Sequence, residues 1–266
     1  MSIVQELPFF PGGTAVTRLA VYDWAAADGV CGGSPHLHTA STEAYVVIGG
    51  SGQVETLSSD GYAAHELTAG NLLWFSPGTV HRLINNGDLD LLVVMQNAGL
   101  PEAGDAVLTF VPEVLADPEW YRRLATLPSP DAGEDVVAAA ALARRDAALA
   151  GYAELRADVE RRGYAALEAF HKAAVNVVRE RVPAWRKLWA DKVLAEVQVT
   201  DAWLSDLEQG EGSHLAKASV ARANPRSAER LFGMCGRLQT WGPGMPAALP
   251  ASKSTWPGNL PDGAQG

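Results

Sequence analysis

The chain has 266 residues, of which 47% are hydrophobic and 20% are charged, and its formal net charge is -10. This composition predicts a globular protein, and no stretch approaches the roughly 18 apolar residues that a membrane span needs. With two cysteines, Cys31 and Cys235, and no secretory signal at the N-terminus, we expect no disulfide framework and a cytoplasmic location.

The acidic excess lies almost entirely in the N-terminal part of the chain. Residues 1–112 contain eleven Asp and Glu but only two basic residues, Arg18 and Arg82, whereas residues 113–266 are nearly balanced. An acidic surface repels the phosphates of nucleic acids, so nucleic-acid binding is not expected. The scarcity of cations also disfavours a phosphorylated substrate in this part of the chain.

Residues 1–112 are predicted to form antiparallel strands. The segments are short, rich in Val, Leu, Thr and aromatic residues, and bounded by Gly, Pro, Asn or Asp. We expect strands at 14–24, 43–50, 52–59, 62–70, 72–76, 81–85 and 89–97. The stretches GGSG (49–52), SSDG (58–61) and NNGD (85–88) are typical of hairpin turns. Closely spaced strands without intervening helices indicate a sandwich or barrel.

From about residue 113 the pattern predicts helices. Residues 134–182 are rich in alanine and place apolar residues at spacings of three, four and seven, which indicates a long amphipathic helix that bends at Gly163. Pro183 suits the first turn of a second helix over 184–199.

Shorter helices are expected at 201–208 and about 226–239. The fold class is therefore α+β: a β domain at 1–112, a mainly helical region at 113–240, and a tail at 241–266. The tail is dense in Gly and Pro and is expected to be extended or disordered.

Two histidines stand one residue apart in the stretch HLHTASTE (36–43). On a strand, His36 and His38 would share one face, because side chains alternate with period two. Glu43 begins the next strand, and His81 opens another directly after a Pro-Gly turn. Three imidazoles and one carboxylate suit a divalent first-row metal, and on an octahedral ion they leave two positions open.

These residues resemble the cupins. The first cupin motif has His-x-His, a glutamate and a glycine, and it is matched by His36, His38, Glu43 and Gly50. The second motif is matched by Gly70, Pro77, Gly78, His81 and Asn85. Here the proline and glycine are adjacent, whereas the family pattern has a residue between them. The resemblance covers roughly residues 10–112 and leaves the helical half unexplained.

The resemblance implies an N-terminal jelly-roll barrel with one divalent transition metal per chain. The implied ligands are His36, His38, Glu43 and His81, and iron is the expected metal, with Mn, Ni, Zn, Cu or Co as alternatives. A homodimer is also expected, because cupins commonly pair through their sheets.

Strand alternation predicts which side chains line the ligand face and which point away from it. Arg82 should point away, and the residues expected on the ligand face are Tyr45, Val47, Leu83 and Asn85. The sequence leaves the register open for Gln53, Glu55, His65, Trp74, and either Met95 or Gln96. Tyr45 is the candidate catalytic residue, as a hydrogen-bond donor or acid, and a place in the barrel core is the alternative. The helical-half histidines, His171 and His214, are expected to be exposed.

Three functions remain open at this point, each with a small-molecule substrate or ligand. The favoured one is a mononuclear non-haem metal oxygenase or dioxygenase. The second is a metal-dependent isomerase, epimerase or lyase, in which a nearby base moves a proton. The third is a non-catalytic metal- or ligand-binding protein whose helices mediate oligomerisation or partner docking.

Overall fold

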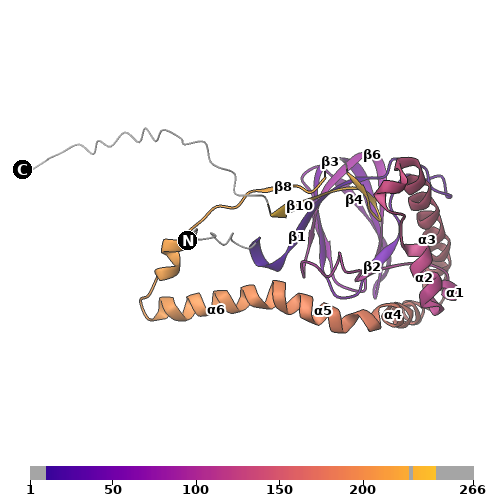
Figure 1. Ribbon diagram of the computed structural model, residues 1–266. Coiled ribbons are helices and arrows are strands. Elements are labelled where there is room, and N and C mark those ends of the chain that lie inside the picture. The colour runs from indigo at the N-terminus through magenta and orange to yellow at the C-terminus, as the bar shows by residue number, and fades with distance from the viewer. Residues whose placement is uncertain (1–9, 228–229, 244–266) are drawn as a thin grey trace, which may run out of the picture.

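The strands of the N-terminal half form an antiparallel barrel, and helices pack along one side of it (Figure 1). The computed structural model describes residues 10–227 and 230–243. The described strands are β1 (Ala15–Val21), β2 (His36–His38), β3 (Glu43–Ser58), β4 (Gly61–Thr68), β5 (Leu72–Phe75), β6 (Val80–Met95), β7 (Ala106–Leu108), β8 (Ala223–Pro225), β9 (Leu231–Phe232) and β10 (Gly236–Pro243). The helices are α1 (Pro112–Ala116), α2 (Pro118–Ala125), α3 (Glu134–Arg162), α4 (Tyr164–Val178), α5 (Val182–Trp189) and α6 (Ala195–Glu208). Short helical turns span Pro11–Gly13, Pro130–Ala132, Arg179–Arg181, Ala190–Leu194 and Ser213–Lys217.

The barrel and the helices confirm the predicted α+β class. Neighbouring strands follow the order β4-β3-β6-β1-β10-β8, and β2 pairs with both β6 and β7. One apolar core fills the barrel interior, and its members include Leu19, Val54, Leu67, Leu89 and Leu91. A second core lies between the barrel and the helices. No helix in residues 10–227 is long and apolar enough to cross a membrane.

Two long strands, β3 and β6, form the largest pairing of the barrel, and this corrects part of the strand prediction. The expected strands at 43–50 and 52–59 are one continuous strand, β3, and those at 81–85 and 89–97 are likewise one strand, β6.

The Gly-rich stretches inside β3 and β6 are bends rather than hairpin turns. The register between the two strands shifts at several points between Val47 and Gly52. Gly50 has φ 69°, and a Cβ there would lie 2.1 Å from the carbonyl oxygen of Asp88. Glycine therefore lets the two strands approach closely where they bend. The turn predicted at 58–61 is confirmed, since Ser58 pairs with Gly61.

Helix α3 is fixed to the barrel by close backbone contact and by a buried arginine. A Cβ at Gly151 would lie 2.2 Å from the carbonyl oxygen of Thr109, so only glycine lets the helix approach this closely. Arg145 is 1% exposed. Its guanidinium donates to the carbonyl oxygens of Trp24 and Ala25, each at 2.9 Å, and so attaches α3 to the loop that precedes β2.

The predicted long helix over 134–182 is two helices, because the chain breaks at Gly163, where φ is 62°. The next helix begins at Val182, with Pro183 in its first turn as predicted. It continues through a π-helical turn into α6 and ends at Glu208, beyond the predicted end at residue 199. Figure 1 shows α5 and α6 running along the barrel and projecting past it.

The segment 226–239 was expected to be helical, and this prediction is wrong. It contains β9 and part of β10. Strand β10 pairs antiparallel with β1 from Thr240 opposite Thr17 to Gly236 opposite Val21, so a C-terminal segment completes the sheet that begins near the N-terminus. The tail predicted at 241–266 lies outside the described residues from residue 244 onward, and residues 241–243 end β10.

Candidate metal centre

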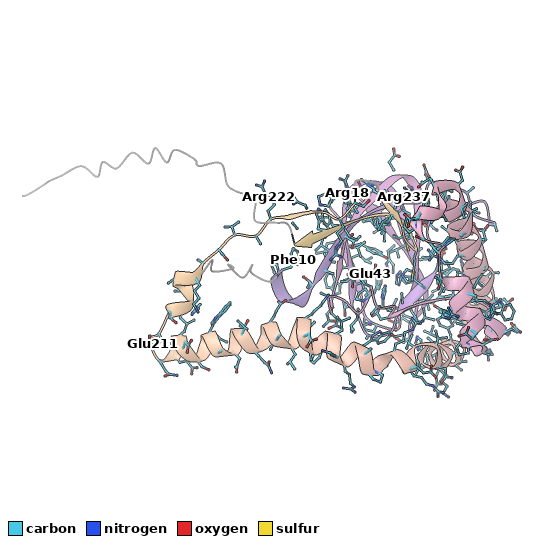
Figure 2. The ribbon with its side chains drawn as sticks, in the orientation of Figure 1. Phe10, Arg18, Glu43, Glu211, Arg222 and Arg237 are labelled. Atoms are coloured by element: carbon cyan, nitrogen blue, oxygen red, sulfur yellow. The ribbon has the colours of Figure 1, made fainter. Side chains whose placement is uncertain are left out.

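Three strands bring the four predicted ligands together inside the barrel. His36 and His38 lie on β2, Glu43 begins β3, and His81 lies on β6 directly opposite His36. Their ligating atoms all lie within 4.8 Å of one another, and all four side chains are buried. Figure 2 shows Glu43 within the barrel. The sequence therefore predicted which residues meet, and their role as metal ligands stays a prediction.

Each of the three histidines is oriented by a hydrogen bond from its Nδ1 to an oxygen atom. The partners are Ser34 O for His36 at 2.9 Å, Thr79 O for His81 at 3.1 Å, and Asp105 Oδ1 for His38 at 2.6 Å. Carbonyl and carboxylate oxygens accept hydrogen bonds, so Nδ1 carries the hydrogen in each ring. Nε2 of each ring is then the nitrogen left to face the common centre, and once deprotonated it offers the lone pair that a metal ligand requires.

The ligating atoms crowd together at the centre and leave Glu43 Oε2 without a hydrogen bond from the described residues. His81 Nε2 lies 3.2 Å from His36 Nε2, a distance at which two lone pairs repel unless a proton or a cation lies between them. Oε2 of Glu43 is 3.2 Å from His38 Nε2 and 3.1 Å from His81 Nε2. Despite these distances, Oε2 accepts no aligned hydrogen bond from any described residue. Closely spaced imidazole nitrogens and a carboxylate oxygen without a hydrogen bond are suitable ligands for a cation.

Burial and charge set the protonation of these groups. Burial, reinforced by the neighbouring His81, lowers the pKa of His36 well below its usual value, so this ring is neutral. Burial would raise the pKa of Glu43, but His81 and His38 outweigh it and hold the pKa well below the usual range. Burial would also lower the pKa of His38, but Glu43 and Asp105 raise it to about 10. The centre thus favours the ionised form of Glu43 next to positively charged groups.

Asp105 is a site residue that the sequence analysis missed. It is fully buried, its Oδ1 accepts from His38, and its Oδ2 has no hydrogen-bond partner among the described residues. It immediately precedes β7, which pairs with β2 so that His38 lies opposite Ala106. This pairing joins segments that are far apart in the sequence, and no local motif announces it.

The interior lining follows the predicted alternation in several places. Tyr45, Val47 and Leu83 belong to the interior core, and Met95 rather than Gln96 joins them. Arg82 lies on the opposite face, under α3, as predicted. Asn85 instead uses its amide to donate to Val21 O and to accept from the backbone at the bend of β6.

The other lining candidates lie elsewhere. Trp74 is 66% exposed on the outer face of the sheet. Glu55 pairs with Arg82 and shares its outward face, and Gln53 on the same strand hydrogen-bonds Glu66. His65 is exposed and contacts Thr56.

A histidine from the helical half supports the second motif. His171 on α4 was expected to be exposed, but it is half-buried, and its Nε2 donates to Gly78 O at 2.8 Å. Gly78 lies in the turn that precedes β6 and His81, so α4 helps to hold the strand that carries this histidine. His214 is also half-buried and stacks on Trp203.

Comparison with known proteins assigns part of the chain to a family. The sequence profile of the cupin domain matches residues 25–96. No curated protein matches the chain.

The solved structures that match the chain are distant in sequence. A conserved protein with a double-stranded β-helix domain from Klebsiella pneumoniae is 16% identical, with 36% of this chain and 77% of that chain covered and a TM-score of 0.28. The nucleoside dehydratase Pac13 is 18% identical, with 37% and 69% covered and a TM-score of 0.28; related structures name its source as Streptomyces. A cupin protein from Bacteroides fragilis is 20% identical, with 32% and 65% covered and a TM-score of 0.24.

The profile match spans β2 to β6 and contains all four buried residues of the centre. Residues 25–96 are therefore a cupin domain.

Proposed function

We propose that the chain is a metal-dependent cupin enzyme that acts on a small organic molecule, with a mononuclear non-haem oxygenase as the favoured reaction. One observation carries this proposal. Three histidines are held by their Nδ1 atoms so that Nε2 faces inward, beside a carboxylate oxygen that accepts no hydrogen bond from the described part of the chain.

The residues fit a divalent first-row transition metal. His36, His38 and His81 would supply nitrogen donors and Glu43 one oxygen, and the charge of the carboxylate offsets part of the charge of the ion. We propose iron, and this donor set also accepts Mn, Co, Ni, Cu or Zn. A bound ion of this kind supplies Lewis acidity and, if it is Fe(II), redox chemistry with dioxygen at the remaining positions.

The chain's own residues supply the surroundings of the reaction. Burial, followed by the negative charge of Glu43, raises the pKa of Tyr45 well above 10, so its hydroxyl stays protonated and can donate a hydrogen bond to a substrate oxygen. This hydroxyl is buried and has no partner among the described residues. Phe75 lies 4.3 Å from the ring of His81 between ring centroids, and such an apolar wall excludes water.

The apolar wall favours the oxygenase over the alternatives. An isomerase, epimerase or lyase needs a base that moves a proton, and the buried carboxylates near the centre, Glu43 and Asp105, already contact histidines. Proton transfer by Tyr45 keeps this second function open. A non-catalytic binding protein would need a metal or ligand at the same centre but no open positions for a reaction.

The metal content of protein purified without oxygen tests the proposal. We expect about one transition-metal ion per chain, lost in His81→Ala because removing one of four ligands weakens the site. The exposed histidine variant His65→Ala serves as the matched control and should keep its metal. Metal that is absent from the wild type, or unchanged in His81→Ala, would contradict the site.

Nitric oxide then tests whether the centre offers Fe(II) an open position for dioxygen. It binds Fe(II) at open positions in place of dioxygen, and we expect wild-type protein loaded with Fe(II) to form a nitrosyl complex visible by electron paramagnetic resonance. A centre that holds Fe(II) but binds no nitric oxide would argue against the oxygenase.

Replacing Asp105 by asparagine should weaken metal binding while leaving the barrel folded. The amide keeps the shape of the side chain but removes the negative charge beside His38, and losing such an orienting partner typically costs about 10–100-fold in affinity. Competition with a chromophoric chelator measures the loss, and thermal unfolding of the metal-free protein checks the fold. Asp60→Asn, in an exposed turn, is the control. Equal affinities for the two variants would show that Asp105 does not orient His38.

We further propose that the chain forms a homodimer through an outer apolar patch, made of Val46, Ile48, Leu72, Trp74, Leu92 and Val94. Trp74 is 66%, Leu72 60% and Ile48 41% exposed. Strand pairing across β5, β3 and β6 places Leu72, Val46 and Leu92 in one row. It places Trp74 and Val94 on either side of Ala44 in the next row, which gives an apolar sheet face. Such a face suits sheet-on-sheet packing around a two-fold axis.

Light scattering after gel filtration tests this interface. We expect wild-type protein to have the mass of a dimer and Trp74→Lys to have the mass of a monomer, because a buried charge opposes the contact. Val220→Lys, at a residue that is 88% exposed, is the control and should remain dimeric. A wild-type monomer, or a Trp74→Lys dimer, would contradict the proposal.

A further inference from the structure

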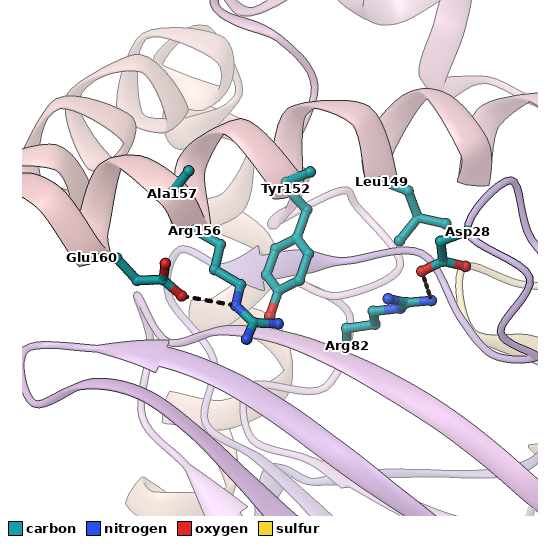
Figure 3. A pocket seen from close by; sticks show the side chains of 8 residues that line it. Asp28, Arg82, Leu149, Tyr152, Arg156, Ala157 and Glu160 are labelled. Atoms are coloured by element: carbon teal, nitrogen blue, oxygen red, sulfur yellow. Dashed lines mark hydrogen bonds and ion pairs between the residues drawn. The ribbon is translucent and has the colours of Figure 1, made fainter.

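A second polar cluster lies on the outer face of the sheet, beneath α3. Arg82 follows His81 on β6 and projects to the opposite face, where it pairs across the strands with Glu55 of β3. Helix α3 lies against this face, and a pocket of about 430 Å³ that is open to solvent lies between them. Its lining residues are Asp28, Arg82, Leu149, Tyr152, Ala153, Arg156, Ala157 and Glu160 (Figure 3).

Arg82 presents to this pocket two donor atoms that make no hydrogen bond to the described residues. The residue is 5% exposed, and its Nε and Nη2 have no hydrogen-bond partner among the described residues. These two N–H groups point the same way and form the fork that grips both oxygens of a carboxylate. Leaving such a buried charged donor unsatisfied is costly, so the fork calls for an acceptor.

Asp28 shows that a carboxylate can bind at this pair of donors. Its Oδ2 lies 2.7 Å from Arg82 Nη2, as the dashed line in Figure 3 marks. The contact is an ion pair without an aligned hydrogen bond, since Nη2 makes none within the described ranges 10–227 and 230–243. The Asp28 side chain is 40% exposed, and it sits in a turn before β2, so a ligand carboxylate can displace it into solvent.

Tyr152 adds a second buried donor. It is 3% exposed, its hydroxyl has no partner among the described residues, and Figure 3 shows its side chain between those of Arg82 and Arg156. Arg156 lies over the ring of Tyr62 at 3.8 Å and 3.3 Å from Glu160. These contacts hold the second guanidinium at the edge of the pocket.

The other residues that line the pocket determine the polarity and charge of the ligand that fits. Leu149, Ala153 and Ala157 give the α3 side of the pocket an apolar surface. Asp28 and Glu160 line the pocket, and Glu55 is buried behind Arg82. These carboxylates repel a doubly charged phosphate, whereas a single carboxylate replaces the charge of Asp28 one for one.

We propose that this pocket binds a small monocarboxylic acid with an apolar body. Its carboxylate would occupy the Nε and Nη2 fork of Arg82 and accept from the hydroxyl of Tyr152, and its body would lie against α3. This site is separate from the centre inside the barrel, and the proposal does not depend on metal binding there.

Calorimetric titration of the full chain with benzoate tests the proposal. We expect saturable binding of benzoate at concentrations up to ~10 mM, where a site with a Kd near 1 mM is filled. Benzamide, which has the same body but no charge, should not bind. Inorganic phosphate should bind more weakly than benzoate. No benzoate binding, or equal binding of benzamide or phosphate, would overturn the proposal.

Two variants locate the binding. Arg82→Lys keeps the positive charge beside Glu55 but loses the fork, and it should weaken benzoate binding by about 10-fold or more. Tyr152→Phe removes a hydroxyl that makes no hydrogen bond to the described residues, so it should weaken benzoate binding without lowering the unfolding temperature. Benzoate affinity that both variants leave unchanged would overturn the assignment.

The variant Glu43→Gln tests whether benzoate binds in this pocket or at the metal centre. The residue lies inside the barrel, on the other side of the sheet, and we expect the variant to bind benzoate as the wild type does. Loss of benzoate binding in Glu43→Gln would place the ligand in the barrel and contradict the proposal. A protein that binds no metal but still binds benzoate would refute the proposed function alone.

Discussion

The candidate centre depends on the hydrogen bonds that hold the three histidines by their Nδ1 atoms. A free imidazole can rotate and exchange tautomers, so a His-x-His pair alone does not define a donor set. Ser34 O, Thr79 O and Asp105 Oδ1 fix both the tautomer and the direction of each ring. Two of these acceptors are backbone carbonyls within two residues of their histidine, which ties the donor geometry to the path of the strands themselves.

The rest of the fold keeps these strands in place. Helix α4 holds the turn before β6 through His171 and Gly78 O, and α3 holds the loop before β2 through Arg145. The same alternation that turns His81 inward turns Arg82 outward under α3. One stretch of β6 therefore serves the barrel interior and the pocket behind it.

Sequence reasoning located the four residues of the centre because the cupin motifs encode them as local spacing. It could not locate Asp105, whose place comes from the pairing of β7 with β2. It mistook the bends of β3 and β6 for hairpin turns, since glycine suits both, and only contact between the strands tells them apart. It assigned 226–239 to helix because pairing with β1, which makes β10 a strand, is tertiary information.

The donor set is the central claim, and X-ray absorption of the zinc-loaded protein measures it directly. The account predicts only nitrogen and oxygen neighbours at about 2.0–2.2 Å, with the multiple-scattering pattern of three imidazoles. Cys235 provides the sharpest alternative, because its Sγ lies 3.9 Å from His36 Nδ1. A sulfur neighbour at about 2.3 Å, or a pattern without imidazole, would contradict the account.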